Sequence, residues 1–161
     1  MKVSSTTFEN GGEIPSKYSC DGDNINPPLM ISGIPEGAKS LVLIMDDPDI
    51  PDTVKRLKNI EVFDHWLIYN ITPETEGFSE TGTLNIEEGK EPAGVKGLNS
   101  SGTLKYMGPC PPDTEHRYFF KVHALSSLID LPEGATKKEV ELAMDGLVLD
   151  SAQIIGRYKR I

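Results

Sequence analysis

The apolar residues of this sequence lie in short runs that are rich in Val, Ile, Tyr and Phe and are separated by turn residues. The 15 glycines and 12 prolines are spread throughout the chain, which leaves little room for long helices. Short runs of β-branched and aromatic residues between turns are typical of β-strands. We therefore expect strands at residues 3–8, 29–34, 40–46, 62–71, 117–125 and 152–160.

One helix is clearly indicated near the C-terminus. Thr136 and Glu139 have the spacing of a capping box, in which each residue satisfies a backbone N–H near the other. Apolar residues then recur at helical spacing, including Val140, Met144 and Leu147. We expect a helix that begins just after Thr136.

Two other segments complete the expected organisation. Residues 52–58 are expected to form a short helical turn with Asp52 as its N-cap. Residues 87–115 contain five glycines and four prolines, and a loop of this length in a compact domain is usually functional or disordered. The sequence thus predicts a mostly β fold with a C-terminal helix and a short helical turn. Its 161 residues are about the size of one domain, so a single domain over residues 1–161 is expected.

The charge balance disfavours nucleic acid and anionic membrane surfaces as partners. The net charge is -9, the isoelectric point is about 4.8, and the basic groups are short and scattered. A phosphate backbone is bound by clustered Lys and Arg, which this sequence lacks. The N-terminus has no apolar core of signal-peptide length, and no run approaches a membrane span. We expect a cytoplasmic protein without membrane insertion.

The two cysteines, Cys20 and Cys110, permit one disulfide at most. Neither belongs to a C-x-x-C pair, so a zinc or redox motif is not supported. Two thiols are the default in a cytosol, although intracellular disulfides occur in hyperthermophiles. The pairing of the two residues stays open.

Three of the expected strands carry a polar group near one end of an apolar face. Alternate side chains of a strand share a face, so these faces follow from the residue numbers. The first face ends in Asp47, and Asp49 joins it if the extended chain continues past Pro48. The three faces comprise Leu41, Leu43, Met45 and Asp47; Phe63, His65, Leu67, Tyr69 and Ile71; and His116, Tyr118, Phe120, Val122 and Ala124.

We expect the polar ends of these faces to meet in one pocket. A buried polar group left without a partner costs about 1–3 kcal/mol, so these groups are best satisfied by one another. A carboxylate such as Asp47 favours the protonated form of a neighbouring imidazole. Protonated His65 and His116, with the Tyr118 hydroxyl and backbone N–H groups, would form a receptor for a small anion.

The other polar residues of these strands receive structural interpretations. His123 has the opposite parity from His116 and is expected to be structural or at the surface. Asp46 is expected to cap a turn. Trp66 is expected to face away from His65, into the core.

Five motifs follow one another in this order along the chain: Asp47-Pro-Asp49-x-Pro51, Asp64-His65-Trp66, Gly97-x-Asn99, Tyr106-x-Gly-Pro-Cys-Pro-Pro112 and His116-Arg-Tyr118. They resemble the phosphatidylethanolamine-binding protein (PEBP) family, and within it the bacterial and archaeal branch described as Raf kinase inhibitor-like. The similarity extends to Cys20-Asp-Gly22 near the start and to Ala152-Gln-Ile-Ile-Gly-Arg-Tyr158 at the end. It covers nearly the whole chain.

The resemblance implies Greek-key antiparallel β-sheets with a small anion pocket at one end. The pocket positions of the family fall on Asp47, Asp49, His65, His116 and Tyr118, with Gly108, Pro109 and Pro111 in one wall. Known ligands of the family are small anions such as phosphate and acetate and, in eukaryotic members, phospholipid headgroups, and some members inhibit kinases or proteases. Asp64 replaces a histidine of the eukaryotic relatives, and the helix that helps gate their pocket has no counterpart here. By its parity Asp64 faces away from His65, whereas the missing helix weakens the case for lipid-headgroup binding and kinase regulation.

The leading hypothesis is a non-catalytic binding protein for a small anionic ligand, without a cofactor or metal. A hydrolase is the main alternative, because Asp, His and Tyr are also parts of such enzymes. Its nucleophile is not evident, since Ser100-Ser101 lack a G-x-S-x-G elbow and Cys110 lies between prolines. A divalent metal held by two Asp and two His is a third hypothesis. Inhibition of a protease or kinase partner through residues 87–115 is a fourth hypothesis. The sequence does not decide the oligomeric state, and a homodimer is one possibility.

Overall fold

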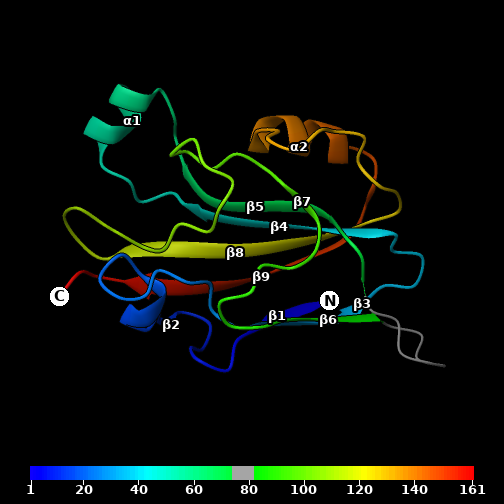
Figure 1. Ribbon diagram of the computed structural model, residues 1–161, viewed down its shortest axis with the longest axis horizontal. Coiled ribbons are helices and arrows are strands. Elements are labelled where there is room, and N and C mark those ends of the chain that lie inside the picture. Colours follow the sequence, from blue (N-terminus) through cyan, green and yellow to red (C-terminus); the bar gives the residue numbers. More distant parts are fainter. Residues whose placement is uncertain (74–81) are drawn as a thin grey trace.

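The computed structural model describes residues 1–73 and 82–161, which form two β-sheets and two α-helices (Figure 1). The larger sheet has the order β2 (Gly12–Glu13), β9 (Val148–Tyr158), β8 (His116–Leu125), β4 (Ser40–Asp47), β5 (Phe63–Ile71) and β7 (Val95–Lys96). The smaller sheet has the order β1 (Lys2–Ser4), β3 (Leu29–Ile34) and β6 (Gly82–Ile86). The helices are α1 (Asp52–Lys58) and α2 (Lys137–Met144), and a 3-10 turn covers Ser16–Tyr18.

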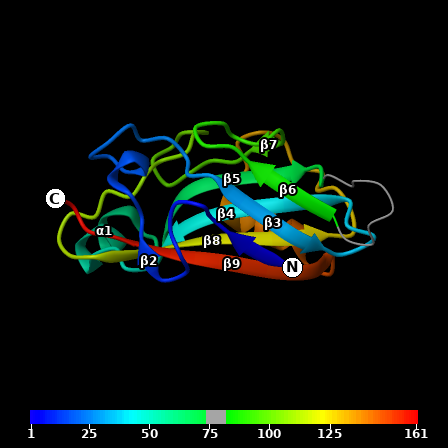
Figure 2. The same ribbon diagram turned by 90° about the horizontal axis from the view of Figure 1, so that it is seen from below.

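The two sheets and α2 form three layers. The smaller sheet packs across one face of the larger sheet, and α2 lies on the other face (Figures 1 and 2). Between the sheets, Leu43 and Met45 of β4 pack with Ile31 of β3. Under α2, Ile44 packs with Val140 of the helix. Because β4 is buried on both faces, its sequence is a continuous apolar run rather than an alternating one.

The described strands pair antiparallel, as expected, with one exception. β2 and β9 are parallel, through the pairs Gly12–Gly156 and Glu13–Arg157, so this edge of the larger sheet departs from the expected antiparallel pairing. A Cβ on Gly156 would lie 2.4 Å from Cγ1 of Ile14. Glycine therefore allows the segment after β2 to lie directly against β9.

Several element bounds match the expectations and others differ. β3 and α1 begin and end where expected, and Thr136 and Glu139 form the expected capping box of α2. Asp52 is not the N-cap of α1, because Pro51 holds that position, and no side chain of the described residues caps this helix. β1 ends at Ser4 instead of residue 8. β2 and β7 were not expected, because strands of two residues are too short to show a pattern.

A β-bulge in β5 sets the direction of His65. Asp46 pairs with Asp64 and Met45 pairs with Trp66, so His65 is an extra residue without a partner on β4. A bulge places two residues of one strand opposite one residue of its neighbour and so re-aims a side chain. His65 and Trp66 both lie on the side of Met45, and Trp66 packs between the sheets. The expectation that Trp66 faces away from His65 is therefore wrong.

The residues that follow the bulge exchange faces. Leu67 and Tyr69 pack under α2, while Ile68 lies between the sheets. The expectation that Leu67 and Tyr69 share the face of His65 is wrong, because simple alternation does not count the inserted residue. A second register shift falls near Asn70, which has a φ of 55° that Asn adopts more readily than most residues.

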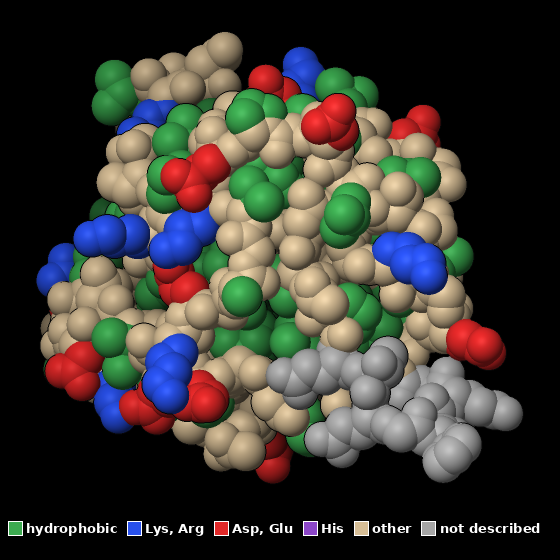
Figure 3. Space-filling view, turned by 45° about the vertical axis from the view of Figure 1, so that its right-hand side comes forward, with side chains coloured by type: hydrophobic (Ala, Val, Ile, Leu, Met, Phe, Trp, Pro, Cys, Tyr) green, Lys and Arg blue, Asp and Glu red, His purple; other side chains and the backbone are tan. Residues whose placement is uncertain are grey.

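Charged side chains of both signs are intermixed. On the face in Figure 3, Lys and Arg side chains lie next to Asp and Glu side chains. Asp46 does not cap a turn as expected; its carboxylate lies 2.7 Å from Nζ of Lys121. Lys137 lies 2.6 Å from Asp64, whose side chain points away from the pocket described below. Within the described ranges, no helix is long and apolar enough to cross a membrane.

Candidate functional site

A pocket of about 180 Å³ lies at the end of the larger sheet where β4 ends and β5 and β8 begin. Antiparallel pairing brings these three strand ends together. The polar residues that line the pocket are Asp47, His65, His116 and Tyr118. The rest of the lining comes from the segment before and within α1, from Phe63, and from residues 107–112. Residues 65 and 116 therefore share one pocket, as expected.

His116, at the start of β8, is held between two carboxylates. Its Nδ1 lies 2.7 Å from Oδ2 of Asp47, and its Nε2 lies 2.8 Å from Oδ1 of Asp113. A neutral imidazole donates from one nitrogen only, so two carboxylate acceptors require the cationic ring. Burial alone would lower the pKa of His116, but the hydrogen bonds to Asp47 and Asp113 outweigh it and raise the pKa above its ordinary value.

The Asp47 carboxylate is buried and fixed by two donors. Its Oδ2 accepts the Nδ1–H of His116, and its Oδ1 accepts the backbone N–H of Asp49 at 2.7 Å. Burial raises the pKa of Asp47, and the hydrogen bond from His116 opposes this shift. Because both oxygens accept hydrogen bonds from N–H groups, we assign a carboxylate and an imidazolium to this pair at neutral pH.

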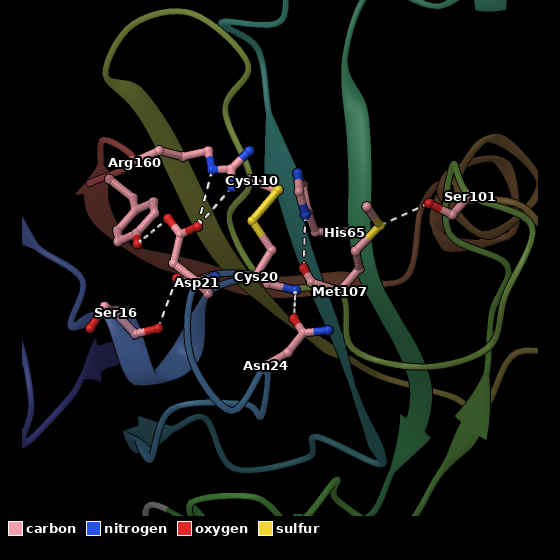
Figure 4. The surroundings of a disulfide bond; sticks show 12 residues. Ser16, Cys20, Asp21, Asn24, His65, Ser101, Met107, Cys110 and Arg160 are labelled. Carbon is pink, nitrogen blue, oxygen red and sulfur yellow. Dashed lines mark hydrogen bonds and ion pairs between the residues drawn. A yellow bond between two sulfur atoms is a disulfide. The ribbon is translucent and has the colours of Figure 1, made fainter.

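His65, in contrast to His116, is neutral. Its Nδ1 lies 2.8 Å from the carbonyl oxygen of Met107 (Figure 4). A carbonyl only accepts, so Nδ1 carries the proton and Nε2 carries a lone pair. Burial lowers the pKa of His65 to about 4. The expectation of two cationic imidazoles is therefore wrong for His65, since no carboxylate of the described residues bonds to its ring.

Tyr118 contributes a hydroxyl group. Its side chain is fully buried, and within residues 1–73 and 82–161 its hydroxyl has no hydrogen-bond partner. Burial raises the pKa of Tyr118 well above its ordinary value, and Asp47 adds to the shift, so the hydroxyl keeps its proton. The backbone of Cys110 opposes the shift, but its contact does not have hydrogen-bond geometry. A ligand that accepts from this hydroxyl would remove a cost of about 1–3 kcal/mol.

A disulfide joins Cys20 to Cys110, with Cα atoms 5.4 Å apart, which is within the usual range (Figure 4). The pairing that the sequence left open is therefore a disulfide. Cys110 lines the pocket, so the bond ties the pocket wall to the segment after the 3-10 turn. The backbone N–H of Cys20 also donates to the carbonyl of Pro109 at 3.1 Å.

The same wall is tied to the N-terminal segment by hydrogen bonds. The hydroxyl of Tyr106 donates to the carbonyl of Tyr18 at 2.8 Å, and the N–H of Gly108 donates to Oδ1 of Asn24 at 2.8 Å. A Cβ on Gly108 would lie 2.3 Å from the Tyr18 carbonyl oxygen. Only glycine fits this close approach, so Gly108 positions the wall without lining the pocket.

The residues expected at the pocket divide into two groups. Those that line it are Asp47, His65, Pro111, His116 and Tyr118. Those that do not line it are Asp49, Gly108 and Pro109. Asp49 lies outside because the chain turns at Pro48, and its carboxylate pairs with Nε and Nη2 of Arg117, each at 2.8 Å.

Asp113 and Met107 contact the pocket imidazoles and were not expected from the sequence. Asp113 bonds to His116 through its side chain, and its position three residues before a histidine was an available signal. Met107 acts through its backbone carbonyl on His65, which no residue type reveals. Apolar lining from Ile50 was also not expected, because this residue lies in the irregular segment between β4 and α1, where no periodic pattern applies.

The sequence matches the family model for phosphatidylethanolamine-binding proteins over residues 4–159. It is 48% identical to a UPF0098 protein of Methanothermobacter thermautotrophicus, with 99% of each chain covered. It is 41% identical to a UPF0098 protein of Chlamydia trachomatis, again with 99% of each chain covered. These names state no activity.

Two solved structures share the fold. A phosphatidylethanolamine-binding protein homologue from Chlamydia trachomatis has a TM-score of 0.88 and 39% identity, covering 99% of this chain and 97% of that one. E. coli YbcL, described as a member of the mammalian PEBP family, has a TM-score of 0.79 and 27% identity, covering 99% and 98%. The expected mostly β, PEBP-like fold is confirmed. With sequence similarity over almost the whole length, these findings show that the chain belongs to the phosphatidylethanolamine-binding protein family.

Proposed function

We propose that this protein is a non-catalytic binding protein whose pocket takes a small oxyanion, such as phosphate, acetate or a phosphorylated headgroup-like ligand. The observation that carries the proposal is that the buried imidazolium of His116 shares one pocket with the Tyr118 hydroxyl, which has no hydrogen-bond partner among the residues that the structure describes. The pocket volume of about 180 Å³ is below the roughly 300–1,000 Å³ of pockets for drug-sized molecules. A ligand group of a few heavy atoms fits this size.

The polar groups of the pocket offer different functions to a ligand. His116 supplies positive charge, and Tyr118 supplies a neutral hydrogen-bond donor. Nε2 of His65 has a lone pair and no partner among the hydrogen bonds of the described chain, so it can accept a hydrogen bond from a ligand hydroxyl. A carboxylate ligand can interact with His116 and Tyr118. A partly protonated phosphate can interact with both and can also donate its own hydroxyl to His65.

Acetate should bind more weakly as the pH rises. The titratable groups that face His116 are Asp47, Asp113, His65 and Tyr118, and the Asp49 carboxylate nearby is paired with Arg117. In these surroundings the pKa of His116 is raised, whereas the pKa of His65 is about 4. His116 is thus the charged imidazole of the pocket, and it loses its charge at a pH above the ordinary pKa of an imidazole. Affinity should fall roughly tenfold or more from about pH 6 to about pH 9, with a midpoint above the ordinary value of about 6.5.

Titration calorimetry at constant ionic strength measures this dependence, and acetate suits it because its own charge is constant over the range. His116→Gln is the matched variant and should bind weakly at every pH. A wild-type affinity that stays flat over the range would contradict the proposal.

Tyr118→Phe should weaken phosphate binding roughly tenfold, because a hydrogen bond to a charged group is lost. The same variant should be at least as stable as the wild type, since it removes a buried hydroxyl that has no partner in the described structure. Tyr69→Phe is the control: its hydroxyl donates to the Pro132 carbonyl on the other side of the sheet. That variant should lose stability and keep its affinity. Unchanged phosphate binding by Tyr118→Phe would count against a role for the hydroxyl.

A hydrolase is the second candidate, because the neutral His65 could act as a general base through Nε2. Among the described residues that line the pocket there is no Ser, Thr or free thiol, and Cys110 is in the disulfide. Residues 1–73 and 82–161 contain no group of three or more His, Cys, Asp or Glu that could hold a metal ion. Incubation with a panel of esters and phosphoesters tests the alternative. Turnover that is abolished by His65→Ala would favour the hydrolase.

A protease or kinase as a protein partner of residues 87–115 stays a prediction. This segment supplies both the wall of the pocket and the exposed residues 101–103 and Lys105. A pull-down with and without residues 100–105 tests it.

A further inference from the structure

The carboxylate of Asp113 takes the hydrogen bond that His116 would otherwise offer to a ligand. Its Oδ1 lies 2.8 Å from Nε2 of His116. The Nδ1 of the ring is already committed to the buried Asp47. A ring N–H points in one direction in the plane of the ring, so one acceptor at a time can meet it with good geometry. An external anion can bond to His116 only after Asp113 leaves.

Asp113 is placed so that it can leave easily. Its side chain is 46% exposed, whereas that of Asp47 is 3% exposed. Residues 112–115 are all exposed, and Oδ1 of Asp113 accepts one further hydrogen bond, from the N–H of Thr114 at 2.7 Å. Water can replace the contacts of an exposed carboxylate, so a swing of this side chain buries no unpaired polar group.

We propose that Asp113 is an internal competitor of the ligand: its carboxylate holds His116 while the pocket is empty and is displaced when an external oxyanion binds. This inference rests on the proposed anion-binding function. A carboxylate three residues away acts at a high effective concentration, on the order of millimolar or above for such short connections. Asp113 thus sets a threshold that free oxyanions must exceed, and it keeps the buried imidazolium paired in their absence.

The test compares phosphate and acetate binding at about pH 6 by the wild type, Asp113→Asn and Glu115→Gln. Glu115→Gln removes the same charge two residues away, where the carboxylate pairs with Arg157 at 3.0 Å and does not contact His116. We expect Asp113→Asn to lower each dissociation constant roughly three- to tenfold, the size of one net hydrogen bond. Glu115→Gln should change them less than about twofold.

Glu115→Gln distinguishes competition from a general effect of charge, because phosphate at about pH 6 is mainly a monoanion, as acetate is. A long-range electrostatic effect should appear in both variants, since each loses one carboxylate in the same exposed segment. Competition for one N–H multiplies the dissociation constant of every displacing anion by the same factor. After division by the effect of Glu115→Gln, the gain from Asp113→Asn should therefore remain, and it should be equal for phosphate and acetate.

A second readout follows the imidazole itself. Loss of Asp113 removes one of the two carboxylates that raise the pKa of His116, so the NMR titration of its ring should move to lower pH in Asp113→Asn. Acetate binding by this variant should then be lost at a lower pH than in the wild type. Tighter binding at about pH 6 together with this earlier loss is the signature of an internal competitor.

The outcomes separate this inference from the proposed function. Binding by Asp113→Asn that is equal to or weaker than that of the wild type, while His116 is still protonated, would overturn the competition alone. A gain no larger than that of Glu115→Gln would do the same. Absence of binding by all three proteins would overturn the proposed function as well. Binding by Asp113→Asn with none by the wild type would be the strongest support, and Asp113→Ala should repeat it.

Discussion

Replacing Cys20 and Cys110 together by Ser should lower the free energy of unfolding by about 2–5 kcal/mol. The two residues are 90 positions apart, so the disulfide closes most of the chain into a loop and restricts the unfolded state strongly. Urea denaturation of the two proteins measures the difference. The slope of the transition should also rise in the double variant, because an unfolded chain without the crosslink exposes more surface.

Reduction of the wild-type disulfide is the matched control. Treatment with a reductant that is not a thiol should bring the free energy of unfolding of the wild type close to that of the double variant. It should leave the double variant itself unchanged. A difference between oxidised wild type and double variant below about 1 kcal/mol would show that the crosslink contributes little to stability.

Asp47→Ala should lower the free energy of unfolding by about 3–5 kcal/mol at about pH 6, because it leaves the buried His116 without its interior counter-charge. The carboxylate also accepts the N–H of Asp49, so the turn that follows β4 loses a hydrogen bond. Chemical denaturation measures this change. Asp49→Asn is the control two residues away: its carboxylate pairs with Arg117 near the surface, and its loss should cost about 1 kcal/mol or less.

The effect of Asp47→Ala should depend on pH in a defined direction. The pKa of His116 is higher in the folded protein than in the unfolded chain, so the protonated ring contributes stability. That contribution is complete below about pH 6.5 and is lost as the pH rises through the folded value. The difference between the wild type and Asp47→Ala should therefore be smaller at about pH 9 than at about pH 6. A difference that grows toward alkaline pH would contradict the assignment of an imidazolium.

Alternation along the strands predicted part of the site because β4 and β8 are regular where they reach the pocket. His116 and Tyr118 lie on one face of β8, as alternation requires. Asp47, at the end of the neighbouring strand β4, points into the same pocket. Counting failed in β5, where the extra residue His65 has neither a Gly nor a Pro beside it to announce a bulge. His65 still reached the pocket, since the bulge lies at this residue and does not precede it.

Residues 49 and 108 show a different limit of prediction from the sequence. Asp49 was expected in the pocket because an extended chain was assumed past Pro48, whereas the turn there is closed by the hydrogen bond from Asp49 N–H to Asp47. Gly108 belongs to the family motif, but it serves a contact with Tyr18 that depends on a distant part of the chain. Local pattern carries no information on such contacts. β6 was missed for a simpler reason, because its alternation spans only Gly82–Ile86.

The wall of the pocket has a consequence for how this chain can vary. Tyr18, Cys20 and Asn24 help to hold residues 106–110 where they line or support the pocket. Residues 18–24 and 106–110 lie far apart in the chain but are in contact in the structure. We therefore expect them to vary together, so that a substitution in one segment is accompanied by a compensating substitution in the other. Transplanting the pocket to another scaffold would require residues 18–24 to travel with it, although none of them touches the cavity.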